Sequence, residues 1–263
     1  MSDEFTRVYR TIEESQPGAS ALTRRRLVAG AAASLGGLGL LGAPSFARAA
    51  GQRNDPQTIL NIAATVEVLA TIVNTVGAER VSLDAVTKRN VRAAAREELI
   101  HYKVLVDKFG GKPLTKQIWV PDAVFASRVG LLSTLEVGDQ IFVNAYLIAT
   151  RTFGNAGNGR LAVRTAEFMG VEAVHRALAR QSLGKLGNDR IFMKYDQTEK
   201  APDAPNKGQP GFEDVTVAAV QLQQAGFGFG AKGATPGAFY DFDSVKKRTP
   251  TDKDLNTYFP DPD

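Results

Sequence analysis

Apolar and polar residues follow one another along most of the chain with the three- and four-residue spacing of an α-helix. The first such stretch starts at Asp55-Pro56, a pair that favours a helix start because aspartate caps the helix and proline fits its first turn. It then continues without a breaker to Gly77. No region shows sustained two-residue alternation, which would indicate strands. The sequence therefore predicts an all-α domain with three further long helices, at about 86–109, 127–153 and 158–183, each ending at or beside a glycine.

The lengths of the connections predict the topology. The links between the first two helices and between the last two are short, so each pair forms an antiparallel hairpin. The middle link, residues 110–126, has 17 residues. It could span up to roughly 56 Å when extended, whereas a 25-residue helix is only about 37 Å long. We therefore expect a four-helix bundle of two hairpins joined by one long crossover.

The composition changes beyond about residue 187. Seven of the twelve prolines lie in 201–263, and the only helical pattern there is about 213–225, followed by the residues GFGFG. This glycine run lacks the preceding strand and the spacing of a dinucleotide-binding loop. Because the segment is rich in Phe and Tyr, we expect part of it to pack on the bundle. The predicted organisation is a signal segment at 1–49, a helical domain at 50–186 and an irregular C-terminal extension at 187–263.

Residues 23–49 have the three parts of an export signal: a basic cluster, a mildly apolar Gly/Ala-rich stretch and an A-x-A cleavage site. The basic cluster, TRRRLV, resembles the twin-arginine export motif, which implies passage through the twin-arginine translocase. Cleavage after Ala49 would release a periplasmic or extracellular protein. The alternative, an uncleaved membrane anchor, is disfavoured because Pro44 and many glycines interrupt the apolar stretch.

Charge and cysteine content exclude several classes of function. Residues 1–49 hold six Arg and four Asp or Glu and so carry half of the net charge of +4. No dense run of Lys and Arg follows, so we expect no nucleic-acid partner. The chain has no cysteine, which rules out disulfides, thiolate zinc sites and iron–sulfur clusters. Any metal site must use histidine and carboxylates.

The chain has only two histidines, and a glutamate precedes each by three residues: Glu98 before His101, and Glu172 before His175. Residues three apart share one face of a helix, so both members of each pair can bind one metal ion. The other two long helices each carry a glutamate within an apolar row, Glu67 on the first and Glu136 on the third. Buried carboxylates are costly unless compensated, and two divalent cations would balance four of them. The predicted metal ligands are Glu67, Glu98, His101, Glu136, Glu172 and His175.

This ligand order resembles the ferritin-like di-iron carboxylate superfamily, in which two helices give one Glu and two give Glu-x-x-His. With the export motif and the GFGFG turn, the sequence is similar to exported ferritin-like proteins that include desiccation-related proteins. The resemblance implies two iron ions, or manganese, that react with dioxygen or peroxide, and no haem, flavin or nucleotide. Ferroxidase or peroxidase activity in stress protection would follow, with a manganese catalase-like activity as a variant.

The sequence also allows three alternatives to an exported di-iron enzyme. The ionisable residues could be surface charges or the remnants of a site that no longer binds metal. The protein could be a non-enzymatic structural or desiccation-stress protein on the same scaffold. A ferritin cage is disfavoured by export and by the long tail, whereas a homodimer is left open.

Neighbouring residues allow weaker expectations. Asp139, one turn after Glu136, is either a hydrogen-bond partner of a ligand histidine or a solvated helix residue. Tyr102 and Tyr146 are expected as core tyrosines rather than redox partners of the site. Trp119 is expected as a packing anchor in the crossover. Two further acidic residues, Glu97 and Glu167, are expected on the exposed faces of their helices.

Overall fold

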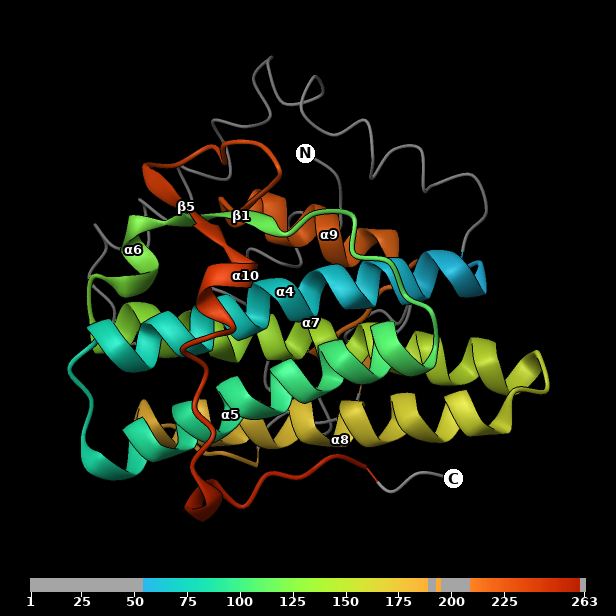
Figure 1. Cartoon of the computed structure of the whole chain (residues 1–263), viewed down its shortest axis with the longest axis horizontal. Coiled ribbons are helices and arrows are strands. Elements are labelled where there is room, and N and C mark those ends of the chain that lie inside the picture. Colours follow the sequence, from blue (N-terminus) through green and yellow to red (C-terminus); the bar gives the residue numbers. More distant parts are fainter. Residues whose placement is uncertain (1–53, 189–192, 195–208, 261–263) are drawn as a thin grey trace, which may run out of the picture.

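Four long helices run side by side through the part of the chain that the computed structural model describes, residues 54–188, 193–194 and 209–260 (Figure 1). The predicted signal segment at 1–49 lies outside these residues. Each helix starts at a side chain that accepts a hydrogen bond from a backbone N–H in the first turn, namely Asp55, Asp84, Ser127 and Asn158. The helices are α4 (Pro56–Arg80), α5 (Ala85–Lys103), α7 (Arg128–Asn155) and α8 (Gly159–Ser182).

These helices form two antiparallel hairpins, α4 with α5 and α7 with α8 (Figure 1). A five-residue π-helical segment, η1 (Val104–Lys108), extends α5, and Gly110 follows it with a φ of 72°. The chain then returns along the helices through β1 (Gln117–Pro121) and the short helix α6 (Asp122–Phe125), so that α5 and α7 point in the same direction. The observed connectivity is two hairpins joined by a crossover.

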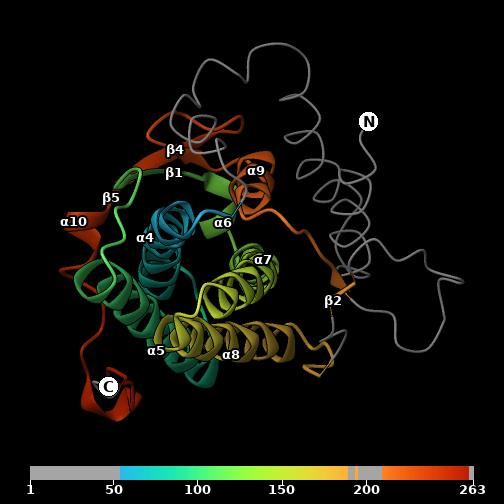
Figure 2. The same cartoon turned by 90° about the vertical axis from the view of Figure 1, so that its right-hand side faces the viewer.

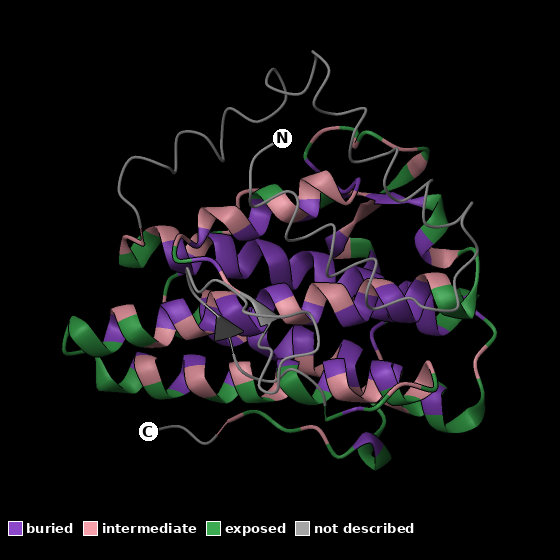
Figure 3. Cartoon of the chain, turned by 180° about the vertical axis from the view of Figure 1, so that it is seen from behind, coloured by how far each residue is buried: buried purple, intermediate pink, exposed green. Residues whose placement is uncertain are grey.

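The first helix extends beyond its predicted end. Gly77 does not break α4, which continues to Arg80. The glycine allows close contact with α7, because a Cβ at this position would lie 2.6 Å from Leu131 Cδ1. Although α4 is long and apolar enough to cross a membrane, 89% of its most apolar window is buried inside the protein. It is therefore the central helix of the core, and Figure 3 shows buried residues gathered on the inward helix faces.

A small antiparallel sheet, which the sequence analysis did not predict, covers α4 on the side away from α8 (Figure 2). Its strand order is β4 (Gly228–Phe229), β1, β5 (Gly237–Asp241). Ile118 and Val120 of β1 are fully buried, whereas Trp119 lies on the other face. The Trp119 Nε1–H donates to the Thr235 carbonyl oxygen at 3.0 Å. Trp119 is thus a packing anchor, as expected.

The described part of the C-terminal extension contains more helices and strands than predicted and packs on the long helices. Its phenylalanines, such as Phe212 and Phe242, belong to the same hydrophobic core as α4 and α7. Asn144 of α7 exchanges two hydrogen bonds with the backbone of Phe212, at 2.8 and 3.0 Å. Tyr102 packs against Phe242 with tilted rings whose centroids are 4.5 Å apart. The elements here are β2 (Met193–Lys194), β3 (Gln209–Pro210), α9 (Thr216–Gln224), α10 (Phe242–Val245) and the 3₁₀ turn η2 (Lys253–Leu255).

Candidate metal centre

A group of ionisable side chains meets in the interior between the two helical hairpins. Every long helix contributes at least one of them, and no member exposes more than 7% of its surface. Side chains of this kind are rarely buried without a partner that neutralises them. The members are Glu67 of α4, Glu98 and His101 of α5, Asp139 of α7, and Glu172 and His175 of α8.

The first of two overlapping clusters, position 1, is formed by Glu67, Glu98, His101 and Glu172. The His101 Nδ1 atom lies 3.5 Å from Glu67 Oε1, 3.3 Å from Glu98 Oε2 and 3.4 Å from Glu172 Oε1. One nitrogen therefore faces three carboxylate oxygens, which is a suitable arrangement for one cation with four ligands.

The second cluster, position 2, is formed by Glu98, Asp139, Glu172 and His175. The His175 Nδ1 atom lies 3.1 Å from Glu98 Oε1 and 3.7 Å from Glu172 Oε2. The ligand atoms of this cluster, including one oxygen of Asp139, all lie within 4.8 Å of one another. A second cation would again have three carboxylates and one imidazole.

Two carboxylates belong to both positions. Glu98 directs Oε2 toward His101 and Oε1 toward His175, while Glu172 directs Oε1 toward His101 and Oε2 toward His175. Each carboxylate can therefore bridge two neighbouring cations with its two oxygens. The helix spacing explains the geometry, because Glu and His three residues apart lie on the same face.

The two hairpins contribute in the same order. The α4–α5 hairpin gives Glu67, then Glu98 and His101, whereas the α7–α8 hairpin gives Asp139, then Glu172 and His175. The two halves differ in one residue type, glutamate in α4 against the shorter aspartate in α7. The centre therefore has approximate two-fold symmetry in its chemistry, but its two positions are not identical.

Many polar atoms of this group have no hydrogen-bond partner in the described part of the chain. They are both carboxylate oxygens of Glu98 and Glu172, one oxygen each of Glu67 and Asp139, and the Nδ1 atoms of His101 and His175. Leaving one such buried group unsatisfied costs about 1–3 kcal/mol, and more when it is charged. So many atoms converging on two points fit metal ions, which would satisfy them together.

Electrostatics in the centre favour protons on its carboxylates when no cation compensates them. Burial, followed by the charge of Glu98, raises the pKa of Glu67 from 4.5 to about 7. Burial and the charge of Glu172 likewise raise the pKa of Asp139 well above its usual range. Crowded carboxylates in a low-dielectric interior hold protons that a divalent cation would displace.

The same carboxylates also raise the pKa values of the two histidines, whereas burial lowers them. Burial alone would lower the pKa of His101, but the charge of Glu67 and contacts with Glu98 and Glu172 raise it well above 6.5. For His175, the effect of burial is similarly outweighed by Glu98 and its neighbours. Protons on the imidazoles thus offset part of the negative charge. Metal binding would have to displace these protons as well.

The structure does not bring Glu136 into the centre, and this corrects the predicted ligand set. Its carboxylate is buried but forms ion pairs with Arg180, the closest contact, and with Lys185, whose Nζ lies 2.7 Å from Oε2. Asp139, one turn further along α7, occupies the corresponding place. Glu136 already has two cationic partners, whereas Asp139 Oδ2 has no hydrogen-bond partner among the described residues. The sequence analysis chose Glu136 as the ligand and expected Asp139 to be a hydrogen-bond partner of a ligand histidine or a solvated residue, whereas the structure gives Asp139 the place of the ligand.

A second residue that the sequence analysis placed wrongly is Glu97. It was expected on an exposed face, yet it is half-buried and its Oε2 lies 2.6 Å from His175 Nε2. Such a carboxylate fixes the ring orientation of a ligand histidine and leaves its other nitrogen directed at the metal. Glu167, by contrast, is exposed as expected and pairs with Arg164.

Tyr146 is the corresponding neighbour of position 1. Its hydroxyl donates a short hydrogen bond to Glu67 Oε1, and burial followed by the charge of Glu67 raises the tyrosine pKa well above 10. The ring of Phe168 lies against His101, with centroids 4.1 Å apart. Position 1 is therefore enclosed by aromatic side chains that keep Glu67 and His101 in place.

Comparison with known proteins identifies no relative: no family model, no curated protein and no solved structure matches this chain. Function must be inferred from the centre itself.

Proposed function

We propose that this chain is an exported ferritin-like protein that holds two iron ions, with manganese as a variant, and reacts with dioxygen or peroxide. The observation that carries the proposal is the sharing of Glu98 and Glu172 between two clusters of four ligands. A single metal site would not require two carboxylates whose oxygens diverge toward two different histidines.

The charge balance supports two divalent cations. Glu67, Glu98, Asp139 and Glu172 carry four negative charges when ionised, and two such cations carry four positive charges. One cation would leave two buried charges uncompensated, which is unfavourable in a low-dielectric interior. Oxygen ligands with imidazole suit iron and manganese, and the chain has no cysteine to favour softer metals.

The connectivity of the helices supports the ferritin-like part of the proposal. Two hairpins joined by a crossover that leaves α5 and α7 pointing in the same direction are typical of ferritin-like folds. In such bundles, ligands project inward from all four helices, as the six side chains do here. The predicted twin-arginine signal and a periplasmic or extracellular location remain part of the proposal.

Each residue has a separate part in the proposed activity. Two ferrous ions held in this centre would supply two electrons to dioxygen or peroxide. Glu98 and Glu172 would hold both ions, while Glu67 and Asp139 would each hold one. Glu97 keeps the Nδ1 atom of His175 directed at the centre. The buried surroundings exclude bulk water and so strengthen the interactions of the carboxylates with cations.

The proposal is tested by adding ferrous ion to the metal-free protein without oxygen, removing unbound ion and measuring iron per chain. We expect two ions per chain, and rapid oxidation on adding air or hydrogen peroxide, followed by ultraviolet absorbance. The double variant His101→Ala/His175→Ala should bind neither ion tightly. A wild-type protein that binds no iron or manganese would contradict the proposal, while two bound ions inert to both oxidants would favour a structural role in stress protection.

A further inference from the structure

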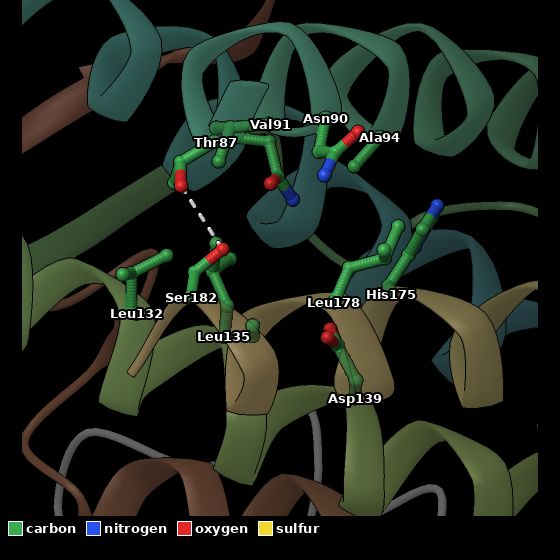
Figure 4. Close-up of a pocket in the computed structure, with 12 residues that line it drawn as sticks. Thr87, Asn90, Val91, Ala94, Leu132, Leu135, Asp139, His175, Leu178 and Ser182 are labelled. Atoms are coloured by element: carbon green, nitrogen blue, oxygen red, sulfur yellow. Dashed lines mark hydrogen bonds between the residues drawn. The ribbon is translucent and has the colours of Figure 1, made fainter. Parts of the chain in front are cut away.

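The two metal positions differ in their surroundings. Position 1 is closed by Phe168 against His101 and by Tyr146, whose ring meets Phe168 edge-on at a centroid distance of 5.6 Å. Position 2 instead adjoins a pocket whose lining includes Asp139 and His175 (Figure 4). Among the residues described, the centre therefore has one enclosed side and one side with free space next to it.

The pocket extends from position 2 along the helices, toward the start of α5 and the end of α8. At its far end the Thr87 hydroxyl donates to Ser182 Oγ at 3.0 Å (Figure 4). Asn90 and Leu178 in its lining are only half-buried, so the pocket reaches the surface between α5 and α8. The remaining walls are mostly apolar, formed by Val91, Ala94, Leu132, Leu135 and Ala179.

One polar group in this lining has an unused acceptor. Asn74 lies two helical turns after Glu67, on the same face of α4, and is only 1% exposed. Its Nδ2 donates to the Ala70 carbonyl oxygen at 3.1 Å, whereas Oδ1 has no hydrogen-bond partner in the described residues. A buried unsatisfied acceptor beside free space is explained by a ligand or water that donates a hydrogen bond.

We propose that hydrogen peroxide reaches the centre at position 2 through this pocket and donates a hydrogen bond to Asn74 Oδ1. This inference rests on the proposed di-metal centre. Dioxygen has no hydrogen to donate and gains nothing from Asn74, while the apolar side chains leave little room for a bulky organic hydroperoxide. Position 1 keeps its ion away from incoming molecules, so the two ions have different roles.

The access route is tested by filling the pocket without altering a ligand. Ala179→Leu places a larger side chain in the lining one turn after His175, and Ala177→Leu makes the same change on α8 outside the lining. Azide is added to the iron-loaded, air-oxidised proteins, and its charge-transfer absorption is titrated. We expect two ions per chain in both variants, with azide affinity lowered at least about tenfold in Ala179→Leu alone.

The role of the asparagine is tested with Asn74→Leu, which removes the acceptor and keeps the number and branching of the side-chain heavy atoms. Loss of one hydrogen bond predicts a reaction with hydrogen peroxide about three- to tenfold slower, with the dioxygen reaction and azide affinity unchanged. Tert-butyl hydroperoxide should react slowly with the wild type and gain rate in Leu178→Ala, which widens the pocket.

Different results would overturn the access route, the role of Asn74 and the proposed function. Unchanged azide affinity in Ala179→Leu, with two ions retained, would overturn the access route. Equal slowing of peroxide and dioxygen in Asn74→Leu would overturn the role of the asparagine. If Ala179→Leu loses an ion, Ala94→Val on the facing helix makes a smaller filling and must lower azide affinity. A wild type without bound metal would reject the proposed function itself, which separates that failure from failure of this inference.

Discussion

Neutralising either of the two buried carboxylates of α7, Glu136 or Asp139, should have opposite effects on stability and on metal binding. Asp139→Asn removes a ligand of position 2, and Glu136→Gln removes the partner of Arg180 and Lys185. Both substitutions neutralise a buried acid with little change in size. The pair therefore separates a metal ligand from a structural ion pair within one helical turn.

The magnitudes follow from the surroundings of each group. The side chain of Glu136 is only 4% exposed, and breaking a buried ion pair from one side costs about 3–5 kcal/mol. Because glutamine keeps one acceptor oxygen, we expect about 3 kcal/mol for Glu136→Gln, or a melting temperature lower by roughly 6–12 °C. In the metal-free protein, burial and the charge of Glu172 raise the pKa of Asp139 well above the usual range, despite the nearby positive charges of His175 and Arg176. Asp139→Asn should therefore leave the metal-free protein equally stable or slightly more stable.

Thermal unfolding in chelator and iron counting after anaerobic loading measure the two effects. We expect two ions per chain in Glu136→Gln despite its lower stability, and one ion in Asp139→Asn despite unchanged stability. The reasoning is refuted if Glu136→Gln loses an ion while Asp139→Asn keeps both. In that case Glu136 is the ligand that the sequence pattern first indicated.

Three further predictions concern the surroundings of the ligands. Glu97→Gln should weaken metal binding at position 2 by about 10–100-fold while leaving position 1 unchanged, because Glu97 orients His175; stepwise titration would show this, and equal weakening of both positions would contradict it. Tyr146→Phe should destabilise the metal-free protein by about 1–3 kcal/mol, since Glu67 loses its donor, and unchanged denaturant unfolding would count against that contact. The pKa of Glu67 is about 7 in the folded protein and 4.5 in the unfolded chain, so a proton on Glu67 stabilises the fold and is lost as pH rises through 7. The free energy of unfolding of the metal-free protein should therefore fall by about 3 kcal/mol between pH 4.5 and 8 because of this group. Glu67→Gln should reduce that loss, and bound metal should reverse the trend because metal competes with protons.

The helices could be predicted from the sequence because their signals are local. Asp55-Pro56, Ser127 and Asn158 mark helix starts whose capping bonds lie within a few residues. The small sheet was missed because β1 is only five residues long and pairs with strands more than a hundred residues later. No local pattern contains that pairing. The long C-terminal extension was expected to be irregular for the same reason.

The sequence predicted the members of the candidate centre correctly on the two helices that carry a pair of them, and chose the wrong carboxylate on α7, which carries one. A Glu-x-x-His pair can be recognised in the sequence because both residues are typical metal ligands and their spacing puts them on one helix face. The structure brings both pairs together, Glu98 with His101 and Glu172 with His175. On α7 the choice between two carboxylates depends on where the end of α8 places its cations. That information lies in the contact between helices. The contact of Glu97 with His175 was missed for the same reason, because it joins α5 to α8.

The most direct test is a crystal structure of the iron-loaded protein with anomalous scattering data collected at the iron edge. The proposed centre requires two iron peaks per chain, one beside Glu67 and His101 and the other beside Asp139 and His175, with Glu98 and Glu172 contacting both. A single peak, a peak at Glu136, or no peak between the hairpins would contradict it.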